Sequence, residues 1–143
     1  TDREYRTHFS LWAMLSSPLM IGCDIREMDA VTKETLTNPE VIAINQDPAC
    51  RQPFLILNWN NDQLVWAKQL EGSDYALGLF NLGDDDRHMD FYWWDLGLPT
   101  AAGYALSLRD LWKHEELGVF PEGMGTDVPA HGCMMLRAKL VKR

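Results

Sequence analysis

Carboxylates are the side chains of this 143-residue chain that could take part in catalysis. Carboxylate-driven hydrolysis needs two of them in one site, one to transfer a proton and one to act as nucleophile or base. Asp24 is the nearest candidate, because it follows residues 19–23, an apolar run typical of a strand buried on both faces. Arg26 could instead pair with Asp24 and make it a structural loop residue, which is the favoured interpretation. We therefore predict no catalytic residue in this chain and only a weak substrate-side candidate, Asp24.

Other residue types that support chemistry lack the required spacing. The three consecutive aspartates at 84–86 have neither the alternation nor the downstream glutamate of a calcium-binding EF-hand loop, so they predict a solvated hairpin turn. The four histidines are His8, His88, His114 and His131. They lie far apart, as do the three cysteines, which predict free thiols. The sequence therefore predicts neither a metal ion nor a cofactor.

Tryptophan is abundant, with six in the chain. Trp93 and Trp94 are adjacent, and adjacent residues of a strand point to opposite faces of the sheet. One of the two is therefore predicted to face solvent or a neighbouring domain. Packing in a core or a domain interface is the favoured interpretation of these tryptophans, and an exposed platform on which sugar rings stack is the alternative.

Composition limits the possible partners. Apolar residues make up 46% of the chain, which is enough for a buried core. The net charge of −8 argues against nucleic acid and anionic membranes as partners, because both require a basic face. The apolar stretch at 11–23 is too short and too interrupted to span a bilayer. The chain has no Asn-x-Ser/Thr sequence, which favours a non-glycosylated bacterial or cytoplasmic source and leaves the localisation open.

The first 50 residues have the pattern of one α/β unit. Thr1 and Glu4 have capping-box spacing, which predicts a helix up to about Ser16. The apolar run at 19–23 predicts a buried strand, and residues 29–36 predict a short helix. A further helix is predicted through residue 44, because Asn38 and Pro39 suit its N-cap and first position.

After Pro48 the pattern changes to short alternating strands separated by turns. The predicted strands are 54–59, 63–70, 75–82, 88–95, 104–112, 117–120, 125–128 and 132–140. Strands of this number and spacing are typical of an antiparallel sandwich. Its predicted core is Leu64 or Val65, with Leu77, Leu79, Phe80, Leu106, Leu108, Leu111 and Leu136. We therefore predict two parts, residues 1–50 and residues 51–143.

Six runs of sequence, in order along the chain, resemble one protein family. They are RTHFSLWAMLSSPLMIGCDIR (6–26), NPEVIAINQDP (38–48), VWAK (65–68), ALGLFN (76–81), RDLW (109–112) and PAHG (129–132). Together they resemble the C-terminal part of the α-galactosidase (melibiase) family, glycoside hydrolase family 27. The resemblance implies that residues 1–50 are the last strand and helices of a TIM barrel. It implies that residues 51–143 form an all-β antiparallel Greek-key sandwich.

The same resemblance implies what the chain does. Family members are retaining enzymes whose two catalytic aspartates lie on earlier barrel strands, so these residues are expected upstream of Thr1. The chain is therefore expected to be the C-terminal portion of a hydrolase of terminal α-galactosides, structural and inactive by itself, with carbohydrate bound through the missing barrel. A stand-alone carbohydrate-binding β-sandwich is the alternative. Without its barrel neighbours the N-terminal piece would expose apolar side chains, so self-association through it is also predicted.

Overall fold

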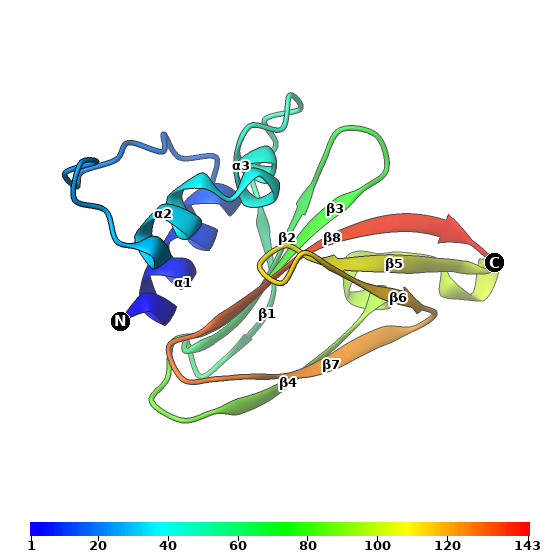
Figure 1. The fold of residues 1–143 in the computed structure, drawn as a ribbon. Coiled ribbons are helices and arrows are strands. Elements are labelled where there is room, and N and C mark those ends of the chain that lie inside the picture. The colour runs from blue at the N-terminus through cyan, green and yellow to red at the C-terminus, as the bar shows by residue number, and fades with distance from the viewer.

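The computed structural model describes residues 1–143 as three helices packed on a two-sheet sandwich (Figure 1). The helices are α1 (Asp2–Met14), α2 (Ala30–Thr37) and α3 (Pro39–Asn45). The strands are β1 (Phe54–Trp59), β2 (Gln63–Gln69), β3 (Tyr75–Asn81), β4 (Arg87–Tyr92), β5 (Tyr104–Asp110), β6 (Glu115–Phe120), β7 (Gly123–Val128) and β8 (Cys133–Lys142). Two 3₁₀ turns, η1 (Trp93–Leu96) and η2 (Thr100–Ala102), lie between β4 and β5. None of the helices combines the length and apolar character that crossing a membrane requires.

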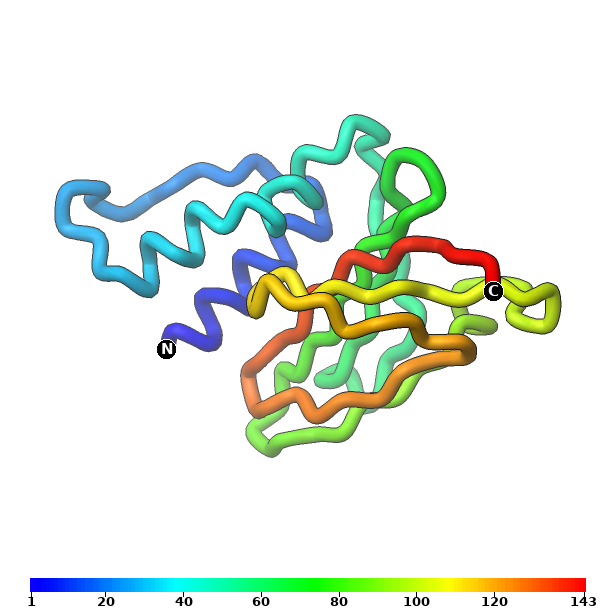
Figure 2. Tube along the Cα trace, turned by 45° about the vertical axis from the view of Figure 1, so that its right-hand side comes forward, coloured from blue at the N-terminus to red at the C-terminus, as the bar shows by residue number.

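The strands form an antiparallel sandwich, as predicted. The large sheet has the order β1-β2-β3-β8-β5-β6, and the small sheet pairs β4 with β7. Every neighbouring pair is antiparallel. The chain leaves the large sheet after β3 to form β4, returns for β5 and β6, leaves again for β7, and ends by inserting β8 between β3 and β5. Figure 2 shows the small sheet lying across one face of the large one.

The three helices begin where the sequence predicts. Thr1 caps α1, because its hydroxyl accepts from the backbone N–H of Glu4, and the Glu4 side chain returns to the N-terminal amine. The Asp29 side chain accepts from the backbone N–H of Thr32 at the start of α2. At the start of α3, the Asn38 side chain caps the helix and Pro39 takes its first position.

Residues 19–23 form no strand, so that part of the prediction is wrong. Neither sheet includes this segment, and Met20 and Ile21 are 82% and 51% exposed. A parallel strand is stable only when neighbouring strands pair its backbone groups and other layers cover its faces. No strand of this chain lies beside the segment, so its apolar composition alone does not make it a strand.

The large sheet is covered on both faces. Its inner face packs against the small sheet and buries Leu77, Leu79, Leu106, Leu108 and Leu136, all predicted core residues. The other face packs against α1 and α3 and buries a second cluster. That cluster includes Phe9, Ala13, Val41, Ile44, Leu70, Phe80, Leu111 and Met135. Because both faces of β3 are buried, its sequence is a continuous apolar run rather than an alternating one.

Two details between the sheets differ from the sequence prediction. The aspartates at 84–86 form a turn, but it joins β3 to β4 in the other sheet instead of closing a hairpin. Trp93 and Trp94 lie in η1 rather than in a strand. Trp93 is fully buried and Trp94 is 60% exposed, so the prediction that one of them faces solvent is confirmed.

Candidate functional site

A network of charged side chains lies where the helices meet the large sheet. Glu40 in the first turn of α3 accepts two hydrogen bonds from Arg109 of β5, from Nε at 2.6 Å and from Nη2 at 2.9 Å. His114 and Glu116 extend this ion pair, contacting Glu40 and Arg109 respectively. The Arg109 guanidinium holds the pKa of the Glu40 carboxyl down at about 2. This network joins the helical segment to the sandwich.

Asn38 makes a second connection close by. Its Oδ1 accepts from the backbone N–H groups of Glu40 and Val41, which caps α3. Its Nδ2 donates to the backbone carbonyl of Leu111 at 2.9 Å, in the turn after β5. The side chain is only 3% exposed. The Asn38 side chain therefore supplies hydrogen-bond partners both to the backbone N–H groups at the start of α3 and to the carbonyl group that follows β5.

Lys68 of β2 makes the third connection and is completely buried. Its Nζ donates to Ser16 Oγ at 2.6 Å and to the Ile44 carbonyl at 2.7 Å, so it contacts the C-terminal ends of both α1 and α3. Burial lowers the pKa of the Lys68 ammonium, and the nearby Asp47 carboxylate opposes that shift. Cations are favourable at helix C-termini, where carbonyl groups lack partners inside the helix.

Asp47 connects the end of the helical segment to the β2–β3 turn. Its carboxylate accepts from the backbone N–H of Glu71 at 3.1 Å and from that of Ala49 at 3.1 Å. Nearby, Asn45 Nδ2 donates to the backbone carbonyls of Trp12 and Ser17. Asn45 and Asp47 of the INQDP sequence therefore connect the end of α3 to the end of α1 and to the β2–β3 turn.

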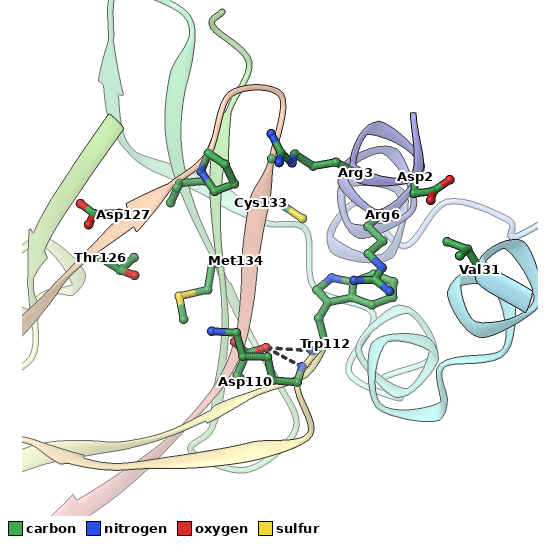
Figure 3. Close-up of a pocket in the computed structure, with 14 residues that line it drawn as sticks. Asp2, Arg3, Arg6, Val31, Asp110, Trp112, Thr126, Asp127, Cys133 and Met134 are labelled. Carbon is green, nitrogen blue, oxygen red and sulfur yellow. Dashed lines mark hydrogen bonds between the residues drawn. The ribbon is translucent and has the colours of Figure 1, made fainter. Parts of the chain in front are cut away.

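A cleft of about 540 Å³ lies between the start of α1 and strands β7 and β8 (Figure 3). Trp112 forms one wall, with the Arg6 guanidinium 5.5 Å from its ring centroid and its own Nε1 donating to Ser10 Oγ at 2.9 Å. Asp110 accepts from the backbone N–H groups of Trp112 and Lys113, which fixes the turn. These contacts hold α1 on the sandwich.

The aspartates that the sequence analysis singled out have ion-pair and backbone partners. Asp24 sits in the loop between α1 and α2 and binds Arg26, with Oδ2 2.6 Å from Nη2 and Oδ1 2.9 Å from Nε. Arg26 lowers the pKa of the Asp24 carboxyl. Asp84 pairs with His131 at the surface, and the Asp86 side chain accepts from the Ala130 backbone. The structure contains no group of three or more His, Cys, Asp or Glu side chains that could hold a metal ion.

An apolar groove of about 670 Å³ runs along the outer side of the helices. Trp12 of α1 and Leu36 of α2 line it together with the irregular segment around Met20 and Ile21. Phe9 also reaches it but is only 8% exposed, because it packs toward the sheet, so the predicted exposure of apolar side chains in the N-terminal piece does not extend to Phe9. The groove is therefore an apolar surface of the helices that lies outside their contact with the sandwich.

The Glu40 ion pair should make stability depend on pH. Because the folded-state pKa of Glu40 lies at about 2, below its ordinary 4.5, its contribution is present above pH 4.5 and is lost as the pH falls toward 2. We expect Glu40→Gln to lower the free energy of unfolding by about 2 kcal/mol at pH 7 and by much less near pH 2.5. Denaturant unfolding across this pH range measures the difference. Glu34→Gln, which removes an exposed ion pair with Arg6, should have little effect at either pH. An equal loss at both pH values for Glu40→Gln would contradict the prediction.

The sequence of the chain matches the models and members of one protein family. Residues 60–138 match the family model described as the alpha galactosidase C-terminal beta sandwich domain, and residues 1–47 match the model described as alpha galactosidase A. A probable alpha-galactosidase of Dictyostelium discoideum is 40% identical over 139 residues, covering 95% of this chain and 36% of that protein. The alpha-galactosidase of Coffea arabica is 42% identical, covering 94% of this chain and 35% of its own length.

Comparison of the structure with solved structures finds members of the same family. The crystal structure of alpha-galactosidase I from Mortierella vinacea superposes with a TM-score of 0.89 at 36% identity, over 96% of this chain and 36% of the other. The chain thus spans about a third of the length of the relatives it matches. The family model of the sandwich matches more than half of the residues of this chain. The chain therefore belongs to the α-galactosidase (melibiase) family of glycoside hydrolases, family 27, and carries the C-terminal β-sandwich domain of that family.

Proposed function

We propose that this chain is the C-terminal portion of a glycoside hydrolase that acts on terminal α-galactosides. The observation that carries the proposal is the continuous match to an α-galactosidase of known structure through both the helices and the sandwich. Residues 1–50 then contribute the end of a barrel, and residues 51–143 form the domain that braces it. The carbohydrate is bound by the barrel, whose other strands supply the two catalytic carboxylates.

The contacts described above suit a bracing role. Lys68, Asn38 and the Glu40–Arg109 pair each connect a helix to the sandwich, and each does so through buried or half-buried polar groups. Asp24 has a different place in the proposal, as a residue of the barrel rim whose pairing with Arg26 shapes the loop. The apolar groove is the surface against which the remainder of the barrel packs.

A chimera tests the proposal. Joining this chain to the preceding two-thirds of the Coffea arabica enzyme, in place of the part it matches, should give a protein that hydrolyses a chromogenic α-galactoside within about tenfold of the parent rate. The 143-residue chain alone should give no turnover, because it lacks the carboxylate pair that forms and hydrolyses a glycosyl-enzyme intermediate. The plant fragment without any C-terminal part serves as the control. A folded chimera without activity, or turnover that scales with the isolated chain after repurification, would overturn the proposal.

The groove provides an independent readout on the isolated chain. When the rest of the barrel does not cover it, two copies should associate through it, because this buries apolar surface on both. Trp12→Asp, in the wall of the groove, should shift light scattering toward the monomer, whereas the chimera should be insensitive to dilution. A strictly monomeric isolated chain at all concentrations would contradict this assignment of the groove.

A further inference from the structure

The outer face of the small sheet carries a row of side chains that the contacts described so far leave unexplained. His88, Asp90 and Tyr92 alternate along β4 and are exposed, while Met89 and Phe91 between them are fully buried. Trp94 follows in η1 and extends the row. Side chains at every second position share one face of a strand, so the row spans about 13 Å from His88 to Tyr92. It is long enough to lie beneath a short oligosaccharide.

Two glycines on the neighbouring strand make room for this row. Gly123 of β7 lies opposite Tyr92, and Gly125 lies opposite Asp90. A Cβ at position 123 would lie 2.8 Å from Tyr92 Cδ1, and one at position 125 would collide with the Asp90 carboxylate. The side chains of Asp90 and Tyr92 therefore lie across β7 instead of standing beside side chains of that strand.

The two aromatic rings at the end of the row are stacked and exposed. The ring centroids of Tyr92 and Trp94 are 4.2 Å apart, and their planes differ by 8°. Tyr92 is 43% exposed and Trp94 is 60% exposed, so Trp94 retains an uncovered aromatic face. Asp90 contacts His88 Nε2 through Oδ1 at 3.2 Å, which leaves its Oδ2 as an acceptor, and the exposed Trp94 offers its Nε1 as a donor.

The turn that presents Trp94 is firmly anchored. Trp93, its neighbour, is fully buried, donates from Nε1 to the Phe120 carbonyl at 2.7 Å, and packs edge-to-face on Phe91. The Asp95 side chain accepts from the backbone N–H of Tyr92, and Gly97 ends the turn in the left-handed region at φ 73°. An exposed ring on such a support loses little conformational entropy when a ligand stacks on it.

The Trp94 end of this row lies away from the helices. The segment that contains η1 and η2 lies beside the C-terminus, at the end of the sandwich far from α1–α3 (Figures 1 and 2). The charges nearby select among ligands that stack on aromatic rings. Single-stranded nucleic acid needs a basic groove, whereas Asp90 and Asp127 lie in or beside the row and the chain carries a net charge of −8. A neutral ligand with an apolar face and several hydroxyl groups fits both the rings and the free polar atoms.

We propose that the outer face of the β4–β7 sheet is a non-catalytic binding site for neutral hexose chains, with one sugar ring stacked on Trp94 and hydroxyl groups of the adjoining sugars bonded to Trp94 Nε1 and Asp90. The site would hold a glycan at the far end of the sandwich from the barrel. The choice of galactose-bearing probes rests on the proposed function, but the site itself rests on the geometry of the row. Binding and hydrolysis are measured on different proteins, so either proposal can fail without the other.

Gel electrophoresis of the 143-residue chain through galactomannan tests the site. The wild type should be retarded, and Trp94→Ala should weaken binding at least tenfold, because base-on-aromatic stacking of similar area has effects of this size. Trp94→Phe, which keeps an aromatic face, should retain most of the binding. Phe54→Ala removes an exposed ring from β1, outside both the row and the groove, and should change nothing.

A nuclear magnetic resonance titration supplies a readout that does not depend on the folding of Trp94→Ala. The indole N–H signal that disappears in Trp94→Phe should shift when raffinose is added to the wild type, and the other indole signals should not. No retardation of the wild type, equal retardation of Trp94→Ala, or a Trp94 signal that raffinose leaves unmoved would each overturn the proposal.

Discussion

Lys68→Ala is expected to lower the free energy of unfolding by about 3–4 kcal/mol, the largest effect of any single substitution considered. The ammonium group is fully buried and donates to Ser16 and to the Ile44 carbonyl. Alanine would leave a cavity and deprive both acceptors of their donor, and a buried acceptor without a partner costs about 1–3 kcal/mol. Ser16 lies at the left-handed φ of 53°, so the lysine also holds a strained end of α1.

Two further variants separate the causes. Lys68→Met keeps the volume of the side chain and removes the charge together with its burial penalty, so we expect a smaller loss, about 1–2 kcal/mol. Lys139→Ala, at an exposed position of β8, should change stability by less than about 0.5 kcal/mol. Denaturant unfolding of the four proteins measures the series. If Lys68→Ala proves as mild as Lys139→Ala, Lys68 does not hold the helices on the sandwich.

Asn38→Ala should have the second largest effect, about 2–4 kcal/mol. Alanine removes the cap of α3, which is worth about 1 kcal/mol, and also leaves the Leu111 carbonyl without its buried donor. Both losses fall on the connection between helix and sandwich, so the helices should become less protected from hydrogen exchange than the sheet. Unfolding by denaturant and exchange of backbone amides measure the two effects.

Two other substitutions divide this effect into its parts. Asn38→Ser can still cap α3 through its hydroxyl but is too short to donate to the Leu111 carbonyl, so it should recover the capping contribution alone. Asp29→Ala removes the cap of α2 at an exposed position and should cost only about 1 kcal/mol. An Asn38→Ala loss no greater than that of Asp29→Ala would show that the bond to Leu111 adds nothing to stability.

The sequence alone determined most of the local structure. Thr1 with Glu4, Asp29, and Asn38 with Pro39 mark helix starts through short-range hydrogen bonds, which depend only on residues three or four positions away. Most strands of the sandwich were predictable because alternating side chains between polar turns favour extended backbone wherever one face is buried. The family was also readable from the six runs of sequence, because they occur in order along nearly the whole chain.

Tertiary structure decided the roles of these same residues. Nothing in the VWAK run indicates that Lys68 is buried, since a lysine in an alternating strand normally points to solvent. Only the packing of α1 and α3 on the large sheet places two helix ends around it. Likewise, the RDLW run gives no sign that Arg109 binds Glu40, because those residues are 69 positions apart.

The apolar run at 19–23 shows the opposite case, where local pattern and outcome differ. Its composition is that of a buried parallel strand, but a strand forms only where other strands supply hydrogen bonds, and this chain supplies none there. Trp94 is an intermediate case. The sequence predicted that either Trp93 or Trp94 is exposed, but the stacking of Trp94 on Tyr92 depends on the η1 turn and on Gly123 of β7, which is distant in sequence. Helix caps, strand periodicity and family were thus set by neighbours in sequence. Burial, pairing and exposure were set by which surfaces the assembled layers cover, because hydrogen bonds and apolar burial between distant segments exist only after those layers meet.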